Sequence, residues 1–117
     1  MRSFLGAVIT VIAVLTLQHS AVAAELVMVD SRACYYCKKF HREMAPTYAA
    51  SAVGQTAPLR KVSVYKRWPS DLAGVRRAPY TPVFILVDGG REIGRFAGYK
   101  SPASFWSRLD RLMARQH

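Results

Sequence analysis

Two cysteines separated by two tyrosines, Cys34-Tyr35-Tyr36-Cys37, place the strongest constraint on what this chain can fold into, and the chain has no other cysteines. The apolar run at residues 26–29 predicts a buried strand just before them. Residues 34–52 predict a helix that begins at the first cysteine. Two thiols at this spacing, at a strand-to-helix junction, are typical of a dithiol that cycles with a disulfide. A purely structural bridge is disfavoured, because closing so short a loop removes little entropy from the unfolded chain.

The N-terminus has the pattern of an export signal. A short basic opening with Arg2 is followed by an apolar run at residues 4–17 and by small residues at 21–24. This pattern predicts a signal peptide over residues 1–24, with cleavage after Ala23 or Ala24, and a single domain over residues 25–117. An uncleaved membrane anchor is the alternative, although the apolar run is shorter than the ~20 residues of a membrane span. Export would place the thiols in an oxidising compartment.

The chain is strongly basic, with 17 Lys and Arg residues against 7 Asp and Glu residues. Such a balance can indicate nucleic-acid binding. The export signal and the absence of aromatic platforms among the basic pairs argue against it. Two interpretations of the basic residues stay open: a solvated surface, or a face that attracts an acidic partner protein or an anionic membrane. We expect a monomer without a nucleic-acid partner.

The remaining elements predict an α/β fold. Strands are expected at residues 59–65, 83–87 and 91–96, a short helix at 68–72, and a last helix capped by Ser101. Within the first helix Pro46 should introduce a kink or end the helix early, and Gly54 should follow its end. The first two strands are joined by a helix and should be parallel, whereas the last two are joined by a tight turn and should be antiparallel. The result is a mixed four-stranded sheet with helices on both faces.

The position of Cys34 at a helix N-terminus favours its thiolate, because free backbone N–H groups and the helix dipole stabilise an anion there. Arg32 and Lys38, with Lys39, add positive charge that stabilises the thiolate. We therefore predict that Cys34 is exposed, has a lowered pKa and acts as the nucleophile. Cys37, one turn into the helix, should be more buried and resolve the mixed disulfide. No cofactor is expected beyond this redox-active disulfide.

The chain resembles small periplasmic thioredoxin-like proteins in its two cysteines, in Thr81-Pro82 and in the strand and turn at residues 83–89. Residues 68–72, 94–99 and 105–106 are also similar to the SoxS-like proteins of bacterial sulfur-oxidation gene clusters. The resemblance implies a cis Thr81–Pro82 bond facing the cysteines, beside which a substrate backbone pairs as an added strand. With Thr81 and Pro82 we assign Tyr35 and Tyr36 to substrate binding.

The resemblance further implies a periplasmic thiol–disulfide reductase. Its substrate would be an exported partner protein, such as a sulfur-carrier protein whose cysteine it keeps reduced. Its electrons would come from a membrane-embedded thiol donor.

Two departures from ordinary thioredoxins limit what can be transferred. Tyr35 and Tyr36 replace the usual Gly-Pro pair, so the reduction potential cannot be carried over. Met28 stands where thioredoxins have a buried acid, and His41 is a candidate for its role in proton transfer. A disulfide oxidase or isomerase, a copper- or zinc-binding module that uses His41, and a non-catalytic binding domain are therefore the alternatives.

Overall fold

A computed structural model describes residues 24–116 of the chain, so the predicted signal peptide, apart from Ala24, lies outside the described residues. Four strands form one sheet in the order β2-β1-β3-β4. They are β1 (Glu25–Asp30), β2 (Leu59–Ser63), β3 (Val83–Asp88) and β4 (Arg91–Ala97). The β1–β2 pair is parallel and the β1–β3 and β3–β4 pairs are antiparallel, which confirms the predicted mixed sheet.

Three short helices replace the single helix predicted at residues 34–52: α1 (Tyr35–Glu43), α2 (Ala45–Ala50) and α3 (Ala52–Thr56). Pro46 lies in the first turn of α2, where its missing N–H costs no helical hydrogen bond. Ser51 is extended, and its side chain accepts a hydrogen bond of 2.9 Å from the Gly54 N–H. The expectation that Gly54 follows the end of the helix is wrong. It lies inside α3, where a side chain would collide with the Tyr48 carbonyl group.

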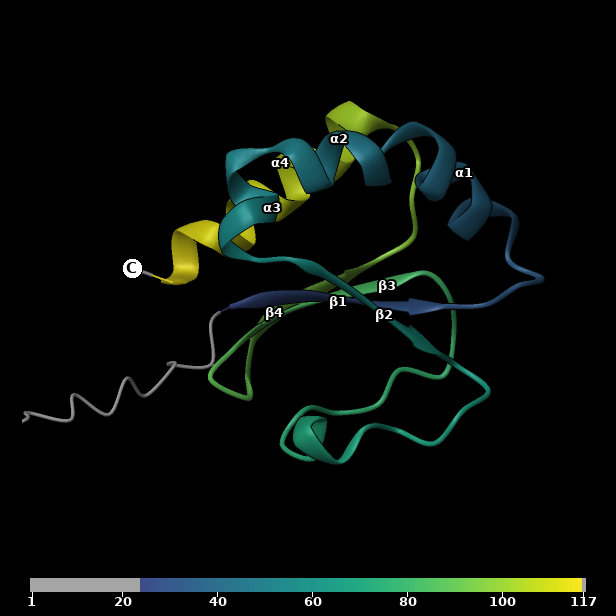
Figure 1. The fold of residues 1–117 in the computed structure, drawn as a ribbon, viewed down its shortest axis with the longest axis vertical. Coiled ribbons are helices and arrows are strands. Elements are labelled where there is room, and N and C mark those ends of the chain that lie inside the picture. Colours follow the sequence, from purple (N-terminus) through teal and green to yellow (C-terminus); the bar gives the residue numbers. More distant parts are fainter. Residues whose placement is uncertain (1–23, 117) are drawn as a thin grey trace, which may run out of the picture.

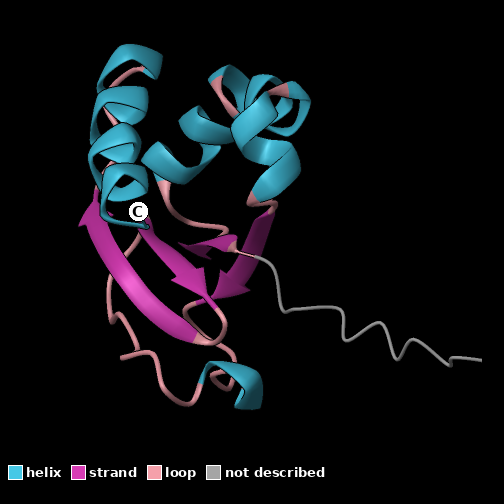
Figure 2. Cartoon of the chain, turned by 90° about the vertical axis from the view of Figure 1, so that its left-hand side faces the viewer, coloured by secondary structure: helices cyan, strands magenta, loops and turns pink. Residues whose placement is uncertain are grey.

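The two faces of the sheet are covered unequally, as Figures 1 and 2 show. All four α-helices of residues 24–116, including α4 (Pro102–Met113), pack on one face. The other face carries the long loop between β2 and β3, whose only helix is the 3-10 turn η1 (Ser70–Leu72). Ser101 caps α4 as predicted, accepting a hydrogen bond from the Ser104 N–H at 3.2 Å. A final 3-10 turn, η2 (Ala114–Gln116), follows.

Each face has its own core because alternate residues of a strand point to opposite sides. Leu26 and Met28 of β1 face the α-helices, whereas Val27 and Val29 face η1. The helix-side core is rich in aromatic rings: Phe40, Phe84 and Phe105 meet at centroid distances of 4.8–5.3 Å. Within residues 24–116, no helix is long and apolar enough to span a bilayer.

Candidate active site

Cys34 and Cys37 form a disulfide at the start of α1. Cys34 is the N-cap residue, and its sulfur accepts a hydrogen bond of 3.1 Å from the Cys37 N–H. Cys34 is half-buried, less open than predicted, whereas Cys37 is fully buried as predicted. Cys34 is therefore the more exposed of the two residues, and a backbone N–H is aimed at its sulfur.

The sheet brings Thr81 and Pro82 to the same end of the central strands as the cysteines. Val29, near the end of β1, pairs with Val83, the first residue of β3. The loop that leads to the cysteines leaves β1 at the end of the sheet where Thr81 and Pro82 enter β3. The Thr81–Pro82 bond is cis, in agreement with the prediction. Pro82 is buried, and its carbonyl oxygen accepts a hydrogen bond of 2.8 Å from the Gly98 N–H.

Exposed tyrosines surround this end of the sheet. Tyr35 and Tyr36 are 64% and 53% exposed, and their rings meet edge to face with centroids 5.2 Å apart. Sequence reasoning missed Tyr65, just beyond the end of β2, and Tyr80, which immediately precedes Thr81; they are 77% and 57% exposed. The position of Tyr80 beside Thr81-Pro82 was the signal that could have found it. Together these are the most exposed large apolar side chains within residues 24–116.

The predicted cations take different positions around the cysteines. The side chains of Arg32 and Lys38 are exposed, and neither is among the ion pairs within residues 24–116. Lys39 instead donates a hydrogen bond of 2.8 Å to the Lys100 carbonyl oxygen, which ties α1 to the segment before α4. Arg32 and Lys38 therefore remain available to an anionic group near Cys34.

Asp30 and His41 are joined by a hydrogen bond between their side chains. His41 Nε2 lies 2.9 Å from Asp30 Oδ2, and the Ser31 N–H donates to Asp30 Oδ1 at 2.8 Å. The pair joins the last residue of β1 to α1. Met28, at the position where thioredoxins carry a buried acid, is fully buried in the apolar core. Asp30 was not singled out in the sequence, because its link to His41 depends on the way α1 returns over β1.

The comparisons with known proteins agree with this geometry. The protein-family model of the thioredoxin-like domain matches residues 18–113 of the sequence. The chain belongs to the thioredoxin-like family. Its fold is the thioredoxin-like α/β fold, and it is a redox protein with a CxxC disulfide. No curated protein sequence matches it.

A crystal structure of the reduced periplasmic thioredoxin SoxS from Paracoccus pantotrophus is similar to this thioredoxin-like protein. The two share 32% sequence identity with a TM-score of 0.75, over 80% of this chain and 99% of that chain. The predicted resemblance to SoxS-like proteins is thereby confirmed. The match extends over almost the whole of the solved relative, so it covers the site as well as the sheet.

Proposed function

We propose that this thioredoxin-like protein is an exported thiol–disulfide reductase that keeps the cysteine of a periplasmic partner protein reduced. A sulfur-carrier protein is the partner that the SoxS resemblance suggests. The observation that carries the proposal is the unequal placement of the two sulfurs, with Cys34 accessible at the helix N-terminus and Cys37 buried. Its similarity to a periplasmic thioredoxin supports both the compartment and the direction.

The reaction has two exchange steps. The Cys34 thiolate attacks one sulfur of the partner's disulfide, forms a mixed disulfide and releases the other sulfur as a thiolate. The Cys37 thiolate then attacks the Cys34 sulfur, which releases the partner's second thiolate and forms the Cys34–Cys37 disulfide. Two electrons pass to the partner. A membrane-embedded thiol donor must reduce the Cys34–Cys37 disulfide again before the next cycle.

Trapping tests these roles. We expect Cys37→Ser to accumulate a mixed disulfide with the partner in periplasmic extracts, because no second thiol can release it. Cys34→Ser is the matched control and should trap nothing. Trapping by Cys34→Ser instead would reverse the assignment.

The reduction potential of the Cys34–Cys37 pair tests the direction. A value near about −270 mV, as in thioredoxin, supports a reductase, whereas a value near about −120 mV indicates an oxidase. The metal-binding alternative is tested by titrating the reduced protein with zinc or copper. Within the described part of the chain, no three His, Cys, Asp or Glu side chains come together.

A further inference from the structure

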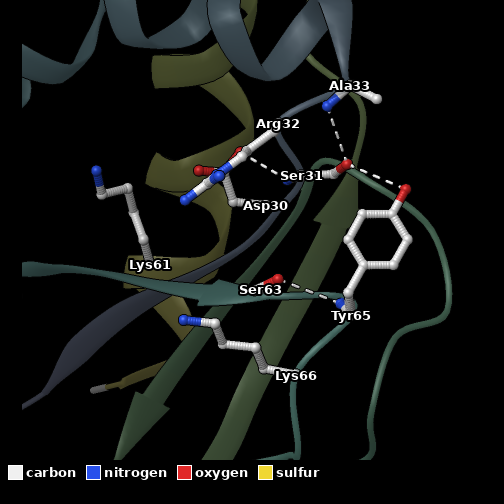
Figure 3. A pocket seen from close by; sticks show the side chains of 8 residues that line it. All are labelled: Asp30, Ser31, Arg32, Ala33, Lys61, Ser63, Tyr65 and Lys66. Atoms are coloured by element: carbon white, nitrogen blue, oxygen red, sulfur yellow. Dashed lines mark hydrogen bonds between the residues drawn. The ribbon is translucent and has the colours of Figure 1, made fainter.

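A pocket of about 650 Å³ opens at the end of β1, and its lining reaches Ala33, the residue before Cys34. Figure 3 shows the side chains that line it, contributed by the end of β1, the loop to α1, and β2 with the residues that follow it. Ser31 and Arg32 belong to its wall, and the Cys34 N–H donates to the Ser31 carbonyl oxygen at 3.2 Å. The pocket therefore adjoins the segment that positions the nucleophile.

Three exposed cations line this pocket: Arg32, Lys61 and Lys66. None of them belongs to the ion pairs within residues 24–116. The pocket has one carboxylate, Asp30, and both of its oxygens are engaged, Oδ1 by the Ser31 N–H and Oδ2 by His41. The site thus has an excess of positive charge that no neighbouring side chain neutralises.

We propose that this pocket binds an acidic segment of the partner protein next to its reactive cysteine. The proposal rests on the reductase function and names the chemistry of its partner. Carboxylates on such a segment would replace the missing counterions of Arg32, Lys61 and Lys66.

A polypeptide fits this site better than a free small anion does. Tyr65 stands at the rim, 77% exposed, with its hydroxyl 3.4 Å from Ser31 Oγ. Tyr35 and Tyr36, which follow Cys34 in the chain, are also exposed. Aromatic side chains are enriched at protein–protein interfaces, and a small anion held by the cations would leave them uncovered. Three of the six other acids are in ion pairs elsewhere: Arg60 bridges Glu25 and Asp71, and Arg95 binds Glu92.

Two disulfide peptides of equal length test the proposal. One carries a short run of glutamates beside its cysteine and the other carries glutamines. The second-order rate constant of their reduction by the reduced protein is measured at low and high salt. We expect the glutamate peptide to react about tenfold faster at low salt, which is the low end of electrostatic steering. High salt should remove this advantage.

The variant combines Lys61→Ser with Lys66→Ser and should lose most of the preference while reducing the glutamine peptide at the normal rate. Arg32 is left intact, because a change there would also alter the Cys34 thiolate. The matched control combines Arg91→Ser, in the first residue of β4 at the opposite edge, with Arg111→Ser in α4, and it removes the same charge. It should keep the preference.

Equal rates for the two peptides would overturn the pocket proposal and leave the reductase function standing. The pocket proposal also fails if the control variant loses the preference as fully as the pocket variant, since net charge would then explain it. Failure to reduce either peptide would instead overturn the proposed function.

Discussion

The phenol of Tyr48, in α2, contacts both the end of α3 and α4. Its side chain is fully buried, its hydroxyl donates a hydrogen bond to the Ala57 carbonyl oxygen, and its ring stacks on Trp106 with centroids 5.8 Å apart. Burial raises the pKa of Tyr48 well above its ordinary value. A buried tyrosinate would lack its hydration, so the folded state retains the proton where the unfolded state loses it.

This raised pKa makes stability depend on alkaline pH. The contribution of Tyr48 is complete below the unfolded pKa of about 10 and is lost as pH rises from there toward the folded pKa. At about pH 11, one unit above the unfolded pKa, the free energy of unfolding should be lower by about 1.4 kcal/mol. Denaturant unfolding at about pH 9 and about pH 11 measures it. Tyr48→Phe should lose less stability between these pH values than the parent, whereas Tyr65→Phe, at an exposed position, should match the parent. Equal losses in all three proteins would contradict this account.

His41 offers a test of how Cys37 loses its proton. It lies four residues after Cys37 in α1, so the two side chains share one face of the helix. Its partner Asp30 orients the ring. We predict that His41→Ala slows release of the mixed disulfide at neutral pH by about 100-fold, the low end of general-base effects. The first attack by Cys34 should keep its rate.

Rapid-mixing measurements with a fluorescent disulfide peptide separate the two steps. Asp110→Ala removes a carboxylate from the exposed face of α4 and serves as the control. If His41→Ala slows both steps alike, the histidine acts on the shape of the site and not on the Cys37 proton.

Among the elements, the three short helices show what sequence periodicity does not register. Phe40, Met44 and Tyr48 repeat every four residues and are all buried, so the apolar stripe predicts one continuous helix. The break at Ser51 depends on an extended backbone and a side-chain cap, which leave no trace in that stripe. The strands were predicted to within two residues, because continuous apolar runs and the Gly89–Gly90 turn delimit them.

Gly54 is the position in these helices at which a side chain larger than glycine's would fit worst. A Cβ there would meet the backbone carbonyl of Tyr48, which cannot move without shifting α2. We expect Gly54→Ala to lower the free energy of unfolding by about 2–3 kcal/mol, the upper range of overpacking. Gly74→Ala is the control, because its new methyl group would lie 3.3 Å from the Gly90 carbonyl oxygen, a contact that a small shift relieves. Urea unfolding compares the two, and an equal effect would show that the close approach at Gly54 is relieved elsewhere.

At the scale of the whole molecule, the sequence predicted the strand directions and the edge at which the site forms. It did not predict how unequally the helices divide between the two faces of the sheet. The second face needed only η1 and its loop, because Leu72, Val75 and Ala78 fill the core there. The pocket beside Cys34 was also invisible in the sequence, since Arg32 and Lys61 are brought together only by the parallel pairing of β1 and β2.

Folding and redox chemistry are linked in one thermodynamic cycle. The difference in stability between the oxidised and the reduced protein therefore tells whether the protein acts as a reductase or as an oxidant. A strong oxidant owes its potential to a stabilised reduced form, whereas a reductase is comparatively more stable with its disulfide closed. Potentials of about −270 and about −120 mV differ by about 7 kcal/mol in this balance. We predict that denaturant unfolding gives the oxidised protein the larger free energy of unfolding. Cys34→Ser, which has no redox states to compare, should unfold identically with and without reductant. A more stable reduced form would make the protein an oxidant and would overturn the reductase proposal without touching the assignment of Cys34 and Cys37.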